Sequence, residues 1–245
     1  MDFTMVLEDN LAEELCNFKN HENYDNKIIE RILHYYKPPI LLSKKYLKKY
    51  YDESTLTSIA GANSHINFNE PVEQLIYKTL YKIILSKEKN GFPYVNIHND
   101  KIENNLTATF TKQEDREKAK KHFEALFQSA ERLFIYDKYL YNNQNSFKEF
   151  AGECFPKRRL KISYLSHFTD PTCSQKFCEN LKTVCADWEV EENNDKNINT
   201  NYNNLHDRYI IIDENIQIIL TSGIDHLINN KKDFTYIIRI IKLNR

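Results

Sequence analysis

The amino-acid sequence predicts an α/β fold, a mixed-sheet sandwich preceded by a helical N-terminal region. Helical periodicity dominates residues 1–90, whereas from residue 91 short β-branched runs alternate with amphipathic helical stretches. The order strand, helix, strand, helix, strand, followed by clustered strands, is typical of an α/β domain with a mixed sheet. We therefore expect two parts, a helical region over 1–90 and an α/β domain over 91–245.

The bulk composition predicts a soluble globular protein. The chain has 245 residues, of which 41 % are hydrophobic and 28 % charged, enough to bury a core. A formal net charge of −1 excludes a global basic field, so nucleic-acid binding would need a local patch. No signal peptide or membrane-spanning run is recognisable, and the five cysteines fit free thiols, so we expect a cytoplasmic protein without a transmembrane segment.

Three helices are expected in the first part. "NKIIERILHYY" (26–36) carries apolar residues at helical spacing and is ended by the two prolines that follow it closely. A second helix is expected over 42–54 with Ser43 as its N-cap. The third, over 70–87, is strongly amphipathic.

The sequence pattern of the second part predicts alternating strands and helices. "FPYVNI" (92–97) and "NLTATF" (105–110) alternate apolar and polar residues, so they are expected to be strands that could pair with each other. "TKQE" fits a capping box, with Thr111 as N-cap and Glu114 reaching back, which opens a helix to about Ala130. The remaining expected elements are strands at 132–137, 159–166, 188–193, 208–213, 216–222 and 234–243, and helices at 146–155 and 173–185.

The stretch "LHDRYIIID" (205–213) contains the most informative spacing in the chain, His206-x-Arg208-x4-Asp213. Alternate residues of a strand share a face, so His206 and Arg208 can point at the same phosphate. Arginine forks around two phosphate oxygens, and histidine can attack phosphorus or transfer a proton. The distal Asp213 can orient a histidine or hold the loop.

This spacing is similar to the H-x-(K/R)-x4-D motif of the phospholipase-D superfamily. The second half of that motif is degraded here, because Thr221 stands where the pattern has Ser and Gly223 where it has Asn. From about Glu124 onward the chain resembles the phospholipase-D-like domain found at the C-terminus of MIT-domain proteins, and its prokaryotic relatives. The resemblance is carried by 129–140, 160–170, "HDR" at 206–208, "TSGIDHL" at 221–227 and 233–239.

The resemblance implies a phospholipase-D-like fold and a catalytically reduced domain. Eukaryotic members of this branch bind phosphoinositide membranes, and its bacterial relatives occur with nucleic-acid conflict and defence systems. Residues 1–90 show no MIT three-helix pattern, so a membrane-trafficking role is not expected for this chain.

The expected site lies where several strands end, since ligands in open α/β folds bind at strand ends. The candidate catalytic residues are His206, Arg208 and Asp213, and the candidate ligand-binding residues are Asp137, Lys138, Asp207, Thr221 and Ser222. Three interpretations stay open for these residues. They form a buried Asp–Arg pair that closes the sheet, a phosphate or ligand site without turnover, or a catalytic centre.

As a function, the sequence favours binding of a phosphate-bearing ligand, such as nucleic acid or a nucleotide, or of a protein partner. The alternative is a metal-independent phosphodiesterase or nuclease that uses His206. The superfamily's chemistry needs two histidines, and His98, His122 and His167 lack the motif spacing. A homodimer could pair two copies of His206, or His167 could serve within one chain. Neither a cofactor nor a metal is expected.

Other clusters have simpler interpretations. Cys173, Cys178 and Cys185 are spaced too widely for an ordinary structural zinc site. The basic, tyrosine-rich stretch at 43–51 could stack nucleobases but is typical of a solvated helix face. The basic turn "KRRLK" (157–161) could contact phosphate or serve solubility.

Overall fold

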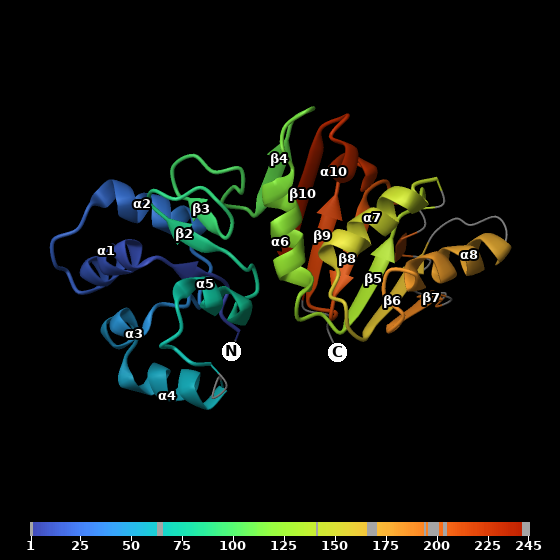
Figure 1. Cartoon of the computed structure of the whole chain (residues 1–245). Helices are drawn as coiled ribbons and strands as arrows, with labels where there is room; N and C mark the ends of the chain where they lie inside the picture. Colours follow the sequence, from blue (N-terminus) through green and yellow to red (C-terminus); the bar gives the residue numbers. More distant parts are fainter. Residues whose placement is uncertain are drawn as a thin grey trace. The chain divides into compact units, whose positions relative to one another are not determined.

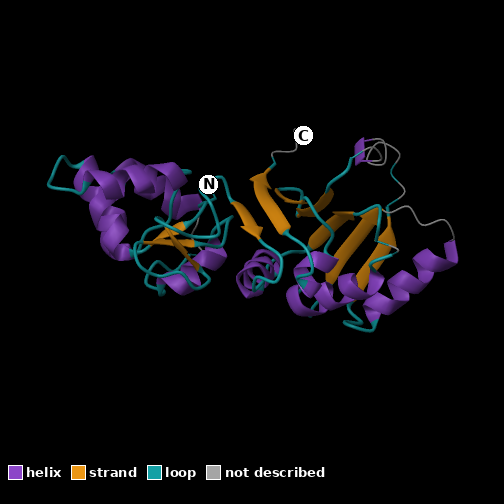
Figure 2. Cartoon of the chain, turned by 90° about the horizontal axis from the view of Figure 1, so that it is seen from above, coloured by secondary structure: helices purple, strands orange, loops and turns teal. Residues whose placement is uncertain are grey.

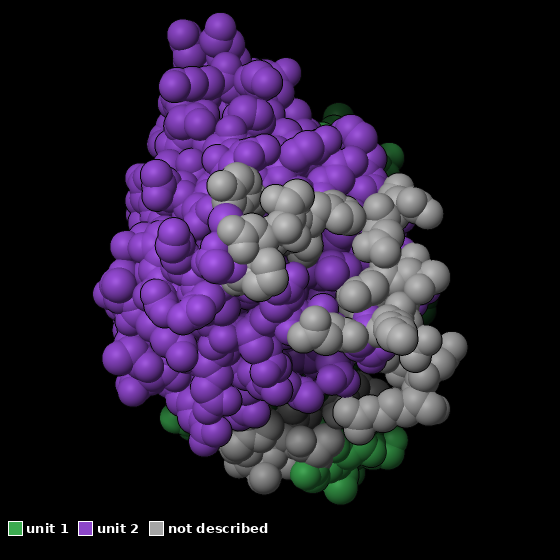
Figure 3. All heavy atoms as spheres, turned by 90° about the vertical axis from the view of Figure 1, so that its right-hand side faces the viewer, with its two compact units in different colours: residues 1–105 green, residues 106–245 purple. Residues whose placement is uncertain are grey.

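The computed structural model divides into two compact units, residues 1–105 and 106–245, which are coloured separately in Figure 3. The structure describes residues 2–62, 66–140, 142–165, 171–193, 195, 201–202 and 205–241. The sequence suggested a division after residue 90, but the boundary lies after Asn105. The shift arises because strand β3 (Tyr94–Asn96) pairs with a strand of the first unit.

The first unit is built around a small parallel sheet. Its strands are β1 (Val6–Leu7), β2 (Ile84–Ser86) and β3, in the order β1-β2-β3. Its helices are α1 (Asp9–Lys19), α2 (Asn26–Tyr35), α3 (Lys44–Tyr50), α4 (Glu53–Ala62), α5 (Val72–Leu75) and the 3₁₀ turn η1 (Ile76–Lys78). The central strand β2 is buried along its whole length, as expected for a parallel sheet covered on both faces.

The expected helix over 26–36 is confirmed as α2, whose N-cap is Asp25. The Asp25 carboxylate accepts hydrogen bonds from the backbone N–H groups of Lys27 and Ile28. The second expected helix is confirmed in part as α3. Ser43 occupies its N-cap position, but the Ser43 side chain makes no capping hydrogen bond.

The third expected helix, over 70–87, is wrong. Only α5 and η1 form there, and the chain then enters strand β2, where Ile84 and Leu85 are fully buried. A short apolar run suits a buried strand as well as a helix, so its periodicity does not decide between them. Here the pairing with β1 and β3 decides for the strand.

The second unit contains a mixed seven-stranded sheet, which confirms the α/β fold class (Figure 1). In sheet order the strands are β4 (Thr107–Phe110), β10 (Phe234–Ile240), β9 (Ile216–Leu220), β8 (Arg208–Ile212), β5 (Arg132–Tyr136), β6 (Leu160–Leu165) and β7 (Trp188–Glu192). Strands β5, β6 and β7 are parallel, and the other neighbours are antiparallel. The expected pairing of 92–97 with 105–110 is wrong, because β4 pairs with β10 instead.

Helices cover one face of this sheet (Figure 2). They are α6 (Glu117–Phe127), α7 (Gln144–Cys154) and α8 (Pro171–Lys182), and the short α10 (Asp225–Asn229) packs against α7. Glu114 accepts the backbone N–H of Thr111 at 2.8 Å, as the capping box predicts, but α6 begins only at Glu117. No helix in the described ranges is long and apolar enough to cross a membrane.

The core between these helices and the sheet is rich in aromatic rings. Phe123 of α6 is fully buried, and its ring centroid lies 4.9 Å from that of Tyr236 and 5.9 Å from that of Phe150. His122 is also fully buried, and its Nδ1 lies 2.9 Å from the Tyr236 hydroxyl. His122 is thus a satisfied core residue and is not available for catalysis.

Truncating the Phe123 side chain should strongly destabilise the second unit. We expect Phe123→Ala to lower the free energy of unfolding by about 3–5 kcal/mol, because it leaves a cavity among packed rings. Urea unfolding is the measurement, and Glu124→Ala, at an exposed position of the same helix, is the control. Equal losses in the two variants would contradict this assignment of the core.

Candidate functional site at the ends of β5, β8 and β9

The pairing of β8 with β5 and β9 brings three chain segments together at one end of the strands, which is called the site edge below. Tyr209 of β8 is opposite Tyr136, the last residue of β5, and Arg208 is opposite Leu220, the last residue of β9. The residues that follow β5 and β9 therefore meet the residues that begin β8. This edge is where the sequence placed the candidate site.

Asp137 and Arg208 form a largely buried ion pair at this edge. The Asp137 side chain is 1 % exposed and the Arg208 side chain 12 %, with Arg208 Nε 3.7 Å from Asp137 Oδ1. Asp137 Oδ1 accepts the backbone N–H of Tyr139 at 2.8 Å. The separation is too long for a hydrogen bond between the two side chains, so the pair is held by charge.

Tyr139 provides an exposed aromatic ring between two cations. The Arg208 guanidinium carbon and Lys138 Nζ each lie 5.1 Å from the ring centroid. The Tyr139 residue is 40 % exposed, so its ring is accessible to solvent. An aromatic ring flanked by Lys138 and Arg208 is a combination that suits phosphate-bearing ligands with a stacking group.

Burial shifts the pKa of the Asp137 carboxyl group. Loss of solvent raises the pKa of the Asp137 carboxyl above its ordinary value, although the Tyr139 N–H and the charge of Arg208 oppose the change. The nearby carboxylate of Asp225 raises this pKa further. Burial therefore makes the charged form of Asp137 more costly in the folded protein than in the unfolded chain.

Several buried polar atoms in this region have no hydrogen-bond partner among the described residues. They are Asp137 Oδ2, Arg208 Nε, Ser222 Oγ and His226 Nδ1, four of the six such atoms in the described part of the chain. Buried polar groups in folded proteins are ordinarily paired. These four atoms lie around the ends of β5, β8 and β9 and in α10, so incomplete hydrogen bonding is concentrated in this region.

The turn from β9 into α10 adds Asp225 and His226, which the sequence reasoning missed. A Cβ on Gly223 would lie 2.1 Å from Asp225 Oδ1, so the Asp225 side chain folds back against the glycine backbone. Asn143, just before α7, also faces this glycine, and His226 Nδ1 lies 3.1 Å from Asp225 Oδ2. The signal was present in "TSGIDHL", but a search by H-x-R-x4-D spacing passes over His226.

His206 does not join the ion pair. Its side chain is 81 % exposed, and its Nδ1 lies 3.8 Å from Asp207 Oδ1. The expectation that His206 and Arg208 share a strand face does not apply, because β8 begins only at Arg208. His167, the other histidine considered within one chain, lies outside the described residues.

Thr221 and Ser222 follow β9 at the same edge. The exposed Thr221 donates its backbone N–H to the carbonyl of Thr235 at 3.2 Å, and its hydroxyl lies 3.5 Å from the same oxygen. Ser222 instead has a buried hydroxyl without a partner in the described part of the chain. Of these two candidates, Ser222 has the free hydrogen-bonding capacity.

Asp213 lies at the opposite end of β8 from Arg208. Its Oδ1 accepts the backbone N–H groups of Glu131 at 3.0 Å and Arg132 at 2.8 Å, where β5 begins. Its φ of 48° places it in the left-handed region of a tight turn. Of the two roles considered for Asp213, the structure places it where it holds the loop, away from His206.

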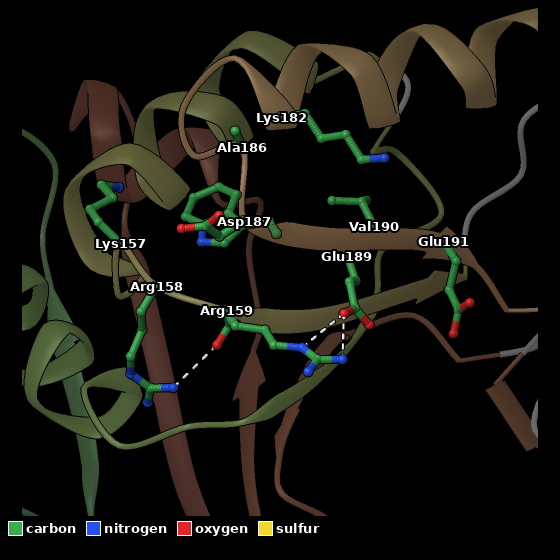
Figure 4. Close-up of a pocket in the computed structure, with 10 residues that line it drawn as sticks. Lys157, Arg158, Arg159, Lys182, Ala186, Asp187, Glu189, Val190 and Glu191 are labelled. Carbon is green, nitrogen blue, oxygen red and sulfur yellow. Dashed lines mark hydrogen bonds and ion pairs between the residues drawn. The ribbon is translucent and has the colours of Figure 1, made fainter.

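The basic turn at 157–161 borders an open hollow of about 650 Å³ at the start of β6 and β7 (Figure 4). Lys157 donates to the carbonyls of Ala151 and Gly152 near the end of α7. Arg158 donates to backbone carbonyls just beyond α6. Arg159 pairs with Glu189 at 2.8 Å. These three cations are already engaged in the fold, so the hollow is a poor phosphate site.

The tyrosines of 43–51 are engaged as well. Tyr46 is buried, and Lys45 Nζ lies 4.6 Å from its ring centroid. The hydroxyl groups of Tyr50 and Tyr51 form hydrogen bonds within the first unit. This arrangement fits a solvated helix face.

No metal-binding cluster of His, Cys, Asp or Glu occurs among the described residues, and all five cysteines are free thiols.

Comparisons with known proteins add little. No protein-family model matches the chain, and no curated protein does. Among solved structures, it is similar to that of TrmBL2, an archaeal chromatin protein with a novel mode of DNA binding, at 8 % identity and a TM-score of 0.25. The match covers 54 % of this chain and 45 % of that one. A similarity this low establishes no common fold and carries no argument about function.

The raised pKa of Asp137 predicts a pH dependence of stability. The native protein binds this proton more tightly than the unfolded chain, so the contribution to stability is full below the unfolded pKa of about 3.9 and is lost as pH rises through the folded pKa. We expect Asp137→Asn to gain stability relative to wild type as pH rises above about 4, with the gain levelling off once the folded-state carboxyl is ionised. Urea midpoints measured across this rise in pH test it, and a difference independent of pH would contradict it.

The position of Asp213 predicts a structural rather than a ligand-binding role. We expect Asp213→Ala to lower the free energy of unfolding by about 1–2 kcal/mol, because two N–H groups lose their acceptor and alanine is strained at positive φ. Asp213→Asn keeps an acceptor oxygen and tolerates this φ, so it should lose less. Thermal unfolding is the measurement, and an Asn variant as unstable as the Ala variant would oppose this role.

Proposed function

We propose that the second unit is a phospholipase-D-like domain that binds a phosphate-bearing ligand, nucleic acid or nucleotide, through Arg208 without cleaving it. The observation that carries the proposal is the state of Arg208. Its Nε is buried without a hydrogen-bond partner in the described part of the chain, next to a carboxylate that it does not hydrogen-bond. The fold thus leaves one donor of this guanidinium without an acceptor, and arginine is the side chain whose geometry best matches phosphate oxygens.

The surroundings of Arg208 support the same proposal. Lys138 adds a second cation beside the Tyr139 ring, and the buried Ser222 hydroxyl adds a donor. Asp137 opposes anion binding through its own charge, but its raised pKa lowers the cost of protonating it when a phosphate arrives. The ligand and the Asp137 proton would therefore bind together, which makes affinity higher at lower pH.

Binding without turnover is favoured because His206 lies outside the strand that holds Arg208. A nucleophilic histidine has to be aligned with the group that holds the phosphate, whereas His206 is exposed outside β8. The proposed setting in a prokaryotic defence or nucleic-acid-processing system is supported by the sequence resemblance alone.

Binding of a labelled single-stranded DNA or RNA oligonucleotide, followed by fluorescence anisotropy, tests the proposal. We expect Arg208→Ala to weaken binding by about 10-fold to 100-fold, the value of one or two charge-assisted hydrogen bonds. His206→Ala should bind nearly as well as wild type. Arg239→Ala, which removes an equal charge from an exposed position of β10, is the matched control.

Two results would contradict this proposal. One is loss of binding in His206→Ala with retention in Arg208→Ala. The other is cleavage of the oligonucleotide in EDTA by wild type that disappears in His206→Ala. The second result would favour the alternative, a metal-independent phosphodiesterase.

One observation supports that alternative specifically. His226 lies beside Asp225 in α10, which follows β9 at the edge of the sheet that carries Arg208. A histidine next to a carboxylate is a combination that general acid–base catalysis uses, although His226 Nδ1 and Asp225 Oδ2 are close without forming a hydrogen bond. In the cleavage assay, a phosphodiesterase would lose activity in His226→Ala as well as in His206→Ala.

A further inference from the structure

The seven-stranded sheet has a second feature on the face that α6, α7 and α8 leave open. A hollow of about 430 Å³ lies over β5, β6 and β8 on that face. Small-molecule sites in proteins are typically about 300–1,000 Å³, so this hollow is large enough for a ligand. It is distinct from the Asp137–Arg208 pair, since Arg208 has the same strand parity as the helix-facing Ile210 and Ile212.

The floor of the hollow is a row of three side chains across neighbouring strands. Phe134 of β5 is opposite Ser163 of β6 on one side and Ile211 of β8 on the other. All three are only partly buried and alternate with the buried residues that face the helices. Because serine is the smallest side chain of the row, it leaves the space above β6 open.

Tyr202 forms a fixed aromatic wall. Its ring centroid lies 5.2 Å from that of Phe134, 5.4 Å from that of Tyr136 and 5.5 Å from that of Tyr209. The Tyr202 side chain also forms a hydrogen bond with Gln217 of β9. A ring held by three others and a hydrogen bond is preorganised for stacking, which reduces the entropy lost on binding.

The charges at the rim are already neutralised. Arg132 Nη1 lies 3.1 Å from Glu214 Oε1, and Lys161 Nζ lies 3.0 Å from Glu191 Oε1. An anionic ligand would have to displace these carboxylates. A neutral ligand is therefore favoured over a phosphate.

The polar groups that remain suit a heteroaromatic edge. The partly buried Ser163 contributes a hydroxyl to the hollow, and Asn193 and Asn201 also line it. Hydroxyl and amide groups both donate and accept hydrogen bonds. An apolar floor, an aromatic wall and a few such groups match a planar ring with donors and acceptors on its edge.

We propose that this hollow binds a neutral heteroaromatic ring of the nucleobase class, which stacks on Phe134 and Tyr202 and bonds through its edge to Ser163. This site is separate from the phosphate site proposed at Arg208 and does not depend on it.

The test uses the full chain with adenosine and uridine as probes, followed by ligand-observed NMR saturation transfer and equilibrium titration. Ser163→Leu fills the hollow from β6, and Tyr202→Ala removes the wall. Thr235→Leu makes the same kind of change on the same face of β10, outside the hollow, and is the matched control. Circular dichroism verifies that each variant is folded.

We expect at least one nucleoside to bind wild type, Thr235→Leu and Arg208→Ala equally, and to bind Ser163→Leu and Tyr202→Ala at least tenfold more weakly. Retention in Arg208→Ala distinguishes this site from the phosphate site. Absence of saturation transfer from both nucleosides, or unchanged affinity in Ser163→Leu, would overturn the proposal. Self-association of the wild type that Ser163→Leu abolishes would also overturn it, because the hollow would then belong to a contact between copies.

Discussion

The second unit depends on the insertion of β8 between β5 and β9. In register, Ile210 of β8 is opposite Ile135 of β5 and Ile218 of β9, and all three side chains are buried against the helices. Full burial of one such side chain is worth about 1.5–3 kcal/mol. A shift of one residue would expose these isoleucines and move Arg208 to the other face, so the same apolar row sets both the stability and the position of the arginine.

The sheet uses its two faces differently. Toward the helices it presents a packed aromatic core that includes contacts with Phe123 of α6 and Phe177 of α8. On the other face, Phe134 and Ile211 are only partly buried, and the small Ser163 leaves a hollow. The two proposed ligand sites thus have different chemistry. The Asp137–Arg208 site is charged and lies at the strand ends, whereas the hollow is largely apolar and lies on the open face of the sheet.

Several positive charges near the sheet are already used by the fold. Lys157 and Arg158 bind carbonyls near helix ends, and Arg159 binds Glu189. Arg208 differs because its partner, Asp137, is buried and does not hydrogen-bond it. Buried charges are costly when their bonding is incomplete, and this is the reason for proposing a ligand at this pair.

Local periodicity was enough to predict the α/β class, α2 and the strands from β5 onward, since those patterns depend on which residues of one segment face the core. It failed over 70–87, because an apolar run becomes helix or strand according to its neighbours, and β1 and β3 are distant in the chain. Motif spacing pointed to Arg208 and strand-end position to Asp137, whereas the expectation that His206 shares a strand face with Arg208 does not apply, because His206 precedes β8. Only the tertiary structure placed Asp213 far from Arg208, added Asp225 and His226, and showed the open face, because sequence spacing does not specify which strands become neighbours.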